Sequence, residues 1–304
     1  MNNTKFPSAK NFRDPEFWNK VKPSNIAAAD RPSWMTFDDE WVDEVRRGLL
    51  ACKVFLWFPL YWLAYNQMTG NLTSQAATMN LGKVPNDIIN NLNPIFIIIT
   101  IPIMDFVLYP AIRKTGFNLT PIKKIAFGFF LSSMAMVSAT VTQHYIYKLS
   151  PCGSDINAQM KAGREDCAAP FTVWIQAFPY GLIGLSEVLA SITKLEYAYT
   201  KAPKNMRSTV QGLALLTSAI SSALGQALVG LSEDPLLVWN YGSVSVIAAL
   251  GGLGFWFTFR KADKDENKLN NLKASKFEGR RQGDVENRET EVVTVGDEKK
   301  ASGL

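Results

Sequence analysis

Apolar residues are concentrated in the middle of the chain, between Leu49 and Arg260, where they form six stretches of near-membrane length. Each approaches the ~20 residues that an α-helix needs to cross ~30 Å of hydrocarbon. The pattern therefore predicts an all-α membrane protein whose six transmembrane helices pack as one bundle over residues 48–260. The predicted spans are Leu49–Met68, Pro94–Ile112, Ile125–Gln143, Phe171–Ser191, Val210–Leu231 and Leu236–Phe259.

The two flanks of this apolar region are polar and charged. Within residues 1–47, apolar positions at helical spacing between Phe37 and Val45 predict an amphipathic helix near 37–47, lying on the cytoplasmic surface and leading into the first span. We expect the rest of this leader to be flexible. Residues 261–304 alternate charges and contain few apolar residues, which is typical of a disordered cytoplasmic tail.

Lysine and arginine gather on one side of the predicted six-helix path. Because basic residues near helix ends stay in the cytoplasm, both termini are expected on that side of the membrane. The net charge of +5 is thus explained by orientation, and we expect no nucleic-acid partner. The basic clusters are Arg46/Arg47, Arg113/Lys114, Lys123/Lys124, Lys201/Lys204/Arg207 and Arg260/Lys261/Lys264.

The predicted outer loops contain two candidate modification sites. Cys152 and Cys167 share the loop Lys148–Pro170, where oxidising conditions permit a disulfide, although two loop cysteines can also remain free. Asn71 begins an Asn-Leu-Thr sequon in the first outer loop and is a candidate for N-glycosylation.

Glu187 lies near the middle of the fourth predicted span, too deep for its side chain to reach water along the helix. Ionisable residues inside a membrane are costly, so such a residue is a functional candidate. Ser191 and Lys194 follow four and seven residues later, at the spacing of one helical face. A neutral glutamic acid hydrogen-bonded within the bundle is the alternative to a site in a wet cavity.

Lys53 and Asp105 form a second possible constellation. Counted from the cytoplasmic ends of the first and second spans, their depths match within a few ångströms at ~1.5 Å per residue. We therefore consider an ion pair across adjacent helices. The alternative is that Lys53 extends to the membrane interface, whereas Asp105 is too short to do so and needs a partner.

Aromatic residues near these charges include Tyr61 and Trp62, which are candidates for the wall of a binding site, although aromatics in membrane helices mostly serve packing or interfacial roles. The chain has one histidine and contains no His-Glu-x-x-His, Cys-x-x-Cys, Walker or Ser/His/Asp pattern. We expect no enzyme activity, no metal site and no cofactor.

Three segments resemble a known family of membrane proteins. The run Gly184–Ser208 (GLSEVLASITKLEYAYTKAPKNMRS) is similar to the tenth helix and following loop of proton-dependent oligopeptide transporters of the fungal branch. Phe58–Gln67 (FPLYWLAYNQ) resembles their seventh helix, and Asn93-Pro94 with Pro102–Asp105 (PIMD) resembles their eighth. The resemblance extends over roughly residues 34–264.

This resemblance implies a major-facilitator fold in which the six helices are helices 7–12, the C-terminal half. It further implies that Glu187, with Asn93 beside it, receives the amino terminus of a peptide. Trp62 corresponds to an aromatic wall of the side-chain pockets, and we add Tyr61 and Ser191 to the expected peptide-binding residues. Asp105 corresponds to an acidic residue that pairs with a basic residue of the preceding helix, for which Lys53 is a substitute here.

The implied function is proton-coupled transport of di- and tripeptides across the plasma membrane, with lipid around the helices and a separate six-helix N-terminal half as partner. One half holds only half of an alternating-access site. The chain is accordingly a fragment of a longer product, a half that assembles with another, or a decayed copy that does not transport. Lys194 departs from the family, where glycine is expected, and its charge competes for Glu187.

Overall fold

The structure is a computed structural model that describes residues 15–27, 30–32, 35–82, 85, 88–89, 91–116, 119–202 and 206–260. The predicted tail 261–304 and the beginning of the leader lie outside the described residues. Helices make up most of the described chain.

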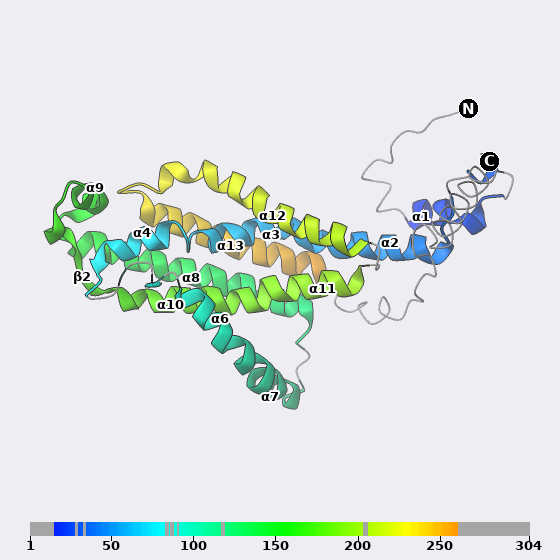
Figure 1. Ribbon diagram of the computed structural model, residues 1–304, viewed down its shortest axis with the longest axis horizontal. Coiled ribbons are helices and arrows are strands. Elements are labelled where there is room, and N and C mark those ends of the chain that lie inside the picture. The colour runs from blue at the N-terminus through cyan, green and yellow to red at the C-terminus, as the bar shows by residue number, and fades with distance from the viewer. Residues whose placement is uncertain are drawn as a thin grey trace, which may run out of the picture.

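The first half of the chain forms α1 (Pro15–Val21), η2 (Pro23–Asn25), α2 (Asp39–Cys52), η4 (Lys53–Trp57), α3 (Phe58–Asn66), α4 (Asn71–Ala77), β1 (Met79–Asn80), α6 (Leu92–Ile103), η5 (Met104–Leu108), α7 (Tyr109–Lys114) and α8 (Pro121–Leu149). The second half forms η6 (Gly153–Asp155), α9 (Ile156–Lys161), η7 (Glu165–Cys167), β2 (Ala169–Thr172), η8 (Val173–Gln176), α10 (Ala177–Glu187), η9 (Val188–Ile192), α11 (Thr193–Lys201), α12 (Arg207–Ala227), η11 (Val229–Leu231) and α13 (Leu237–Phe259). Segments η5 and η9 are π-helical, and the other η segments are 3-10 helices. Of the α-helices, α3, α8, α10, α11, α12 and α13 run along one long axis (Figure 1).

Within the described residues, four of the six predicted spans are helices long and apolar enough to cross a membrane. The first predicted span is helical but divided, because η4 precedes Pro59 and the proline has no amide hydrogen to continue an α-helical ladder. The predicted span Val210–Leu231 forms α12, which is helical but contains more serine, threonine and glutamine. The four spans are Leu92–Lys114, Pro121–Leu149, Val173–Thr200 and Leu237–Phe259.

Helix α8 lies at the centre of the packing, in contact with both α10 and α13, while α3 packs against α12 and α13. Small residues permit the closest approach: a Cβ added to Gly128 of α8 would lie 2.6 Å from Cβ of Ala190 in η9. Rings fill the space between α3, α8 and α13, where Phe58, Phe129 and Phe255 are fully buried. This aromatic core holds the surroundings of Glu187 in place.

The continuous path α6–η5–α7 diverges from the rest of the bundle (Figure 1). Only 6% of the residues in its most apolar 18-residue stretch are buried. Ile98 and Phe106 are 70% and 80% exposed. Pro102, which removes a backbone hydrogen bond, lies just before the π-helical segment η5, and such segments are usual where a helix departs from regular geometry. The large apolar surface of this path is suited to lipid or to another helical body.

Part of the leader that we expected to be flexible is ordered. Helix α1 lies against α2, with Trp18 and Val42 only 6% and 2% exposed. Lys22 Nζ lies 2.7 Å from Asp43 Oδ2, which fixes the turn between the two helices. The predicted amphipathic helix is present as α2, but it continues beyond residue 47 to Cys52.

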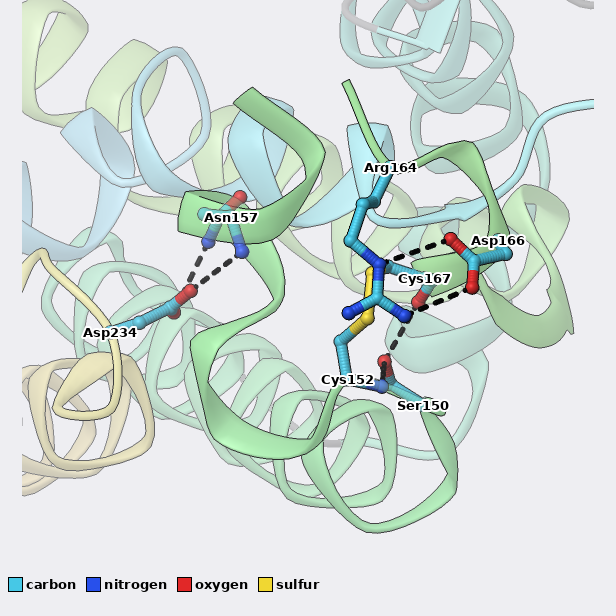
Figure 2. The surroundings of a disulfide bond; sticks show 7 residues. All are labelled: Ser150, Cys152, Asn157, Arg164, Asp166, Cys167 and Asp234. Atoms are coloured by element: carbon cyan, nitrogen blue, oxygen red, sulfur yellow. Dashed lines mark hydrogen bonds and ion pairs between the residues drawn. A yellow bond between two sulfur atoms is a disulfide. The ribbon is translucent and has the colours of Figure 1, made fainter. Parts of the chain in front are cut away.

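The predicted outer loops are tied together at the end of the bundle that carries α4, α9 and β2 (Figure 1). Strand β1 pairs in parallel with β2. Cys152 and Cys167 form a disulfide, and Figure 2 shows Asp234, in the turn before α13, facing both nitrogens of Asn157. The loop after α8 is thereby fixed to β1 and to the turn between α12 and α13.

Candidate functional site

Glu187 is the last residue of α10 and directly precedes the π-helical segment η9. Its side chain is half-buried, and its Oε2 accepts a hydrogen bond of 3.1 Å from Nδ2 of Asn93 in α6. No lysine or arginine forms an ion pair with Glu187 in the described part of the chain. A carboxylate thus lies within a membrane span with an amide donor and without a cation.

Glycines on α10 allow α6 to approach this carboxylate. A Cβ added to Gly184 would lie 3.1 Å from Oδ1 of Asn93 and 3.2 Å from Cβ of Phe96. The side chain of Asn93 is 3% exposed, and its Oδ1 has no hydrogen-bond partner among the described residues. The hydrogen bond to Glu187 therefore depends on a close helix contact that a larger residue at 184 would disturb.

Tyr65 is a member of this site that we did not predict. Its hydroxyl interacts with both Glu187 and Asn93, and its ring meets the Trp62 ring edge-on at 5.0 Å between centroids. Tyr65 follows Trp62 by three residues on α3, so the sequence contained a signal, because residues at this spacing share a helical face. Tyr65 links the carboxylate to the aromatic surface of α3.

Trp62 is partly exposed, and its Nε1 donates a hydrogen bond of 3.2 Å to Oγ1 of Thr217 in α12. Lys194 of α11, which is 2% exposed, holds its Nζ 4.9 Å from the centroid of the Trp62 ring. The ammonium also lies 4.4 Å from the Phe58 ring and 5.8 Å from the Phe55 ring. Lys194 therefore occupies an aromatic cage and does not reach the Glu187 carboxylate.

Two further residues that we assigned to peptide binding are buried in the structure. Tyr61 is fully buried in the aromatic core, with its hydroxyl 3.2 Å from Oγ of Ser186, so the wall beside Glu187 consists of Tyr65 and Trp62 instead. Ser191 is 7% exposed and lies within η9. The π-helical turn between Glu187 and Ser191 also interrupts the regular spacing on which their shared face was inferred.

The structure does not bring Lys53 and Asp105 together. Lys53 begins η4, which packs against α12 and α13, whereas Asp105 is exposed on η5, in the path that diverges from the bundle. The electrostatic interaction of Asp105 is with Tyr109, one turn later on its own helix. Matching depth along two helix axes was therefore insufficient to predict an ion pair. The prediction assumed that both helices lie side by side in one bundle.

The two outer-loop candidates behave differently. The Cys152–Cys167 pair is bridged, and Cys167 is fully buried. Nδ2 of Asn71 donates to Oε1 of Gln67 at 2.6 Å and to Oγ of Ser232 at 3.1 Å, which occupies the nitrogen that a glycan would require. No group of three metal-binding side chains is gathered within the described ranges.

Known proteins with similar sequences include peptide transporters of fungi. Peptide transporter PTR_C of Candidozyma auris is 46% identical over 242 residues, which cover 79% of this chain and 42% of that protein. Peptide transporter PTR2 of Saccharomyces cerevisiae is 39% identical over 253 residues, covering 83% of this chain and 40% of that protein. The chain thus spans about two-fifths of the length of these relatives.

Solved structures with the same fold include an auto-inhibited POT family peptide transporter, which superposes with a TM-score of 0.59 at 22% identity over 73% of this chain and 42% of the other. The POT family transporter PepTSo gives a TM-score of 0.58, also at 22% identity, and covers 76% of this chain and 44% of the other. At this identity the likeness concerns the fold. The sequence model of the POT family matches residues 6–244, and together with the fungal relatives it shows that this chain belongs to the POT family.

Proposed function

We propose that this chain is the C-terminal half of a proton-coupled di- and tripeptide symporter, in which Glu187 receives the substrate ammonium. The observation that carries the proposal is the half-buried Glu187 carboxylate, which has the Asn93 amide as donor and no cation partner among the described residues. A carboxylate in such a place is stable either protonated or paired with a cation. A proton and a peptide ammonium can therefore alternate at Glu187.

The neighbouring groups complete a site for one end of a peptide. Asn93 supplies a donor that fixes one carboxylate oxygen and leaves the other for the ammonium. The Tyr65 hydroxyl adds a polar group beside them, and the partly exposed Trp62 ring offers an apolar surface one turn away. Side chains of the substrate would lie against Tyr65 and Trp62.

The rest of the transporter is proposed from the family. Transport by alternating access needs two halves that move around a site at their interface, and this chain covers about two-fifths of its relatives. A six-helix N-terminal half would supply the remaining contacts to peptide and proton. We place both termini in the cytoplasm, an orientation that the basic residues at the helix ends support. We place the transporter in the plasma membrane. A decayed, non-transporting product is the alternative.

Uptake by a joined transporter tests this proposal. The N-terminal part of S. cerevisiae PTR2, up to the start of its match with this chain, is joined to the full 304-residue chain and expressed in yeast that lacks peptide uptake. We expect pH-dependent uptake of labelled Ala-Ala. Glu187→Gln keeps the shape and removes the charge, and should reduce uptake at least about tenfold, the loss of roughly one charge-assisted interaction of 1.5–3 kcal/mol.

The matched control is Glu196→Gln, which removes a carboxylate from the exposed face of α11 on the same helical path. This variant should transport like the unmodified joined transporter at equal surface expression. N-acetylated dipeptides, which lack the ammonium, should compete poorly. Uptake of Ala-Ala by Glu187→Gln at the unmodified rate would refute the assigned role of Glu187, and absence of any uptake would favour the decayed product.

A further inference from the structure

Lys194 carries a positive charge into the interior of the bundle. The side chain is 2% exposed, and no carboxylate forms an ion pair with it within the described residues. Burying an ammonium without an anion is costly, but the faces of aromatic rings attract cations. The rings of Phe58, Trp62 and Phe55 surround its Nζ at 4.4, 4.9 and 5.8 Å, so the cage retains the charge in place of a carboxylate.

The cage and the proposed substrate site share one wall. Trp62 contacts Lys194 and also meets Tyr65 at right angles, and Tyr65 interacts with Glu187. Lys194 follows Glu187 by seven residues, which is ~10 Å along a helix. The Trp62 indole is held in position by its hydrogen bond to Thr217. A fixed cation therefore lies against the same indole ring that would contact a substrate side chain.

We propose that Lys194 is a specificity-determining residue, which makes the side-chain pocket at Trp62 reject cationic side chains and accept neutral or acidic ones. The proposal rests on the function proposed above. A cation over an indole draws electron density toward itself, so the ring attracts a second cation less strongly. Direct repulsion adds to this effect, because two like charges ~10 Å apart in a protein site still interact measurably.

The expected discrimination is on the order of tenfold in affinity, from a like-charge repulsion at ~10 Å and an effective dielectric constant near 20. It acts on the side chain that lies against Trp62 and leaves the contact between ammonium and Glu187 in place. Peptides that differ only in the charge of one side chain therefore report on Lys194. Ala-Lys and Ala-Met form such a pair, because their side chains have similar length.

The test measures competition of Ala-Lys and of Ala-Met against labelled Ala-Ala in the joined transporter. With Lys194 present, Ala-Lys should require about tenfold more peptide than Ala-Met for the same inhibition. In Lys194→Met the ratio should fall to within about twofold, and in Lys194→Arg, which keeps the charge, it should stay high. Because the ratio is taken within one variant, differences in expression and folding cancel.

Lys124→Met is the matched control, since Lys124 also lies over an aromatic ring, 4.0 Å from the Tyr109 centroid, but near the cytoplasmic start of α8. This variant should keep the unmodified ratio. Equal inhibition by Ala-Lys and Ala-Met with Lys194 in place, or a ratio that Lys194→Met leaves unchanged, overturns the inference while Ala-Ala uptake still supports the transporter. Absence of Ala-Ala uptake overturns the proposed function and the inference with it.

Discussion

The side-chain amide of Asn93 and the carboxylate of Glu187 are joined by a hydrogen bond of 3.1 Å across 94 residues of sequence. Asn93 lies in the first turn of α6, where this helix still contacts α10, and beyond it the path α6–η5–α7 becomes largely exposed. The donor of Glu187 is thus at the base of an element with few other contacts to the bundle. A change in the direction of α6 would act on Glu187 directly.

Replacing Gly184 by alanine should weaken this hydrogen bond without touching Glu187. The new Cβ would lie 3.1 Å from Oδ1 of Asn93, closer than most real contacts, so Asn93 has to move. Loss of a hydrogen bond to a charged group costs ~1.5–3 kcal/mol. We expect the KM for Ala-Ala uptake by the joined transporter to rise about tenfold. Gly212→Ala is the control, because nothing lies within 4 Å of its added Cβ; equal KM values for the two variants would contradict the prediction.

The cysteines of the chain should react with a maleimide in two groups, one before reduction and one only after it. The sequence has three cysteines, of which Cys152 and Cys167 are bridged and Cys52 is free and buried. Denatured but unreduced protein should therefore react with one equivalent of a maleimide, and reduced protein with three. A disulfide that closes a loop of this length adds ~3 kcal/mol of stability. Removing it by Cys152→Ser with Cys167→Ser should lower the thermal midpoint, and three reactive thiols before reduction would refute the bridge.

Asp234 should hold the outer loop through three donors. Its Oδ1 accepts from the Tyr147 hydroxyl at 2.5 Å and from Nδ2 of Asn157 at 3.1 Å, and its Oδ2 accepts from the Asn157 backbone amide at 2.8 Å (Figure 2 shows the Asn157 contacts). Asp234→Asn replaces an acceptor by a donor, so the Asn157 amide should exchange its hydrogen at least about tenfold faster, corresponding to ~1.4 kcal/mol. Asp155→Asn, at an exposed position of the same loop, should leave this rate unchanged.

The contact between α1 and α2 should weaken in acid. Hydrogen bonding from Ser24, together with the charges of Lys22 and Arg31, holds the pKa of Asp39 below its ordinary value of about 4. A carboxyl whose pKa is depressed by folding stabilises the fold above its unfolded pKa, and this contribution disappears as the pH falls through the folded pKa. Below about pH 4 the Ser24 amide, which donates to Oδ1 of Asp39, should therefore exchange its hydrogen faster. Asp39→Asn should show this change already at neutral pH.

The sequence predicted the positions of the helices better than the way in which the helices pack against one another. Apolar stretches indicated where the helices are, and Gly184, Asn93 and Glu187 were contained in segments already singled out by the resemblance. Which side of a helix faces the core was harder to infer. Tyr61 and Tyr65 are one turn apart on α3, yet the first is buried in the aromatic core and the second borders Glu187. Their different positions depend on neighbouring helices that local spacing does not reveal.

Two errors have a common physical origin. The pairing of Lys53 with Asp105 assumed straight, adjacent helices, and the shared face of Glu187 and Lys194 assumed uninterrupted α-helical spacing. Local departures affect both inferences, since Asp105 lies in the π-helical segment η5, and η9 separates Glu187 from Lys194. Pro102 gave a signal for the first segment, but no proline or glycine lies within Val188–Ile192 to indicate the second.

The two π-helical segments share one hydrophobic cluster, in which Met104 of η5 packs with Val188 and Leu189 of η9. A π-helical turn contains one residue more than an α-helical turn, so it accommodates that residue without changing the phase of the helix that follows. Deleting one residue from η9 would therefore convert the wide turn into an α-helical one and leave Lys194 against its rings. The same deletion from an α-helical turn, which has no spare residue, would rotate all that follows by about 100°. The wide turn thus makes this stretch of the chain tolerant of a one-residue deletion.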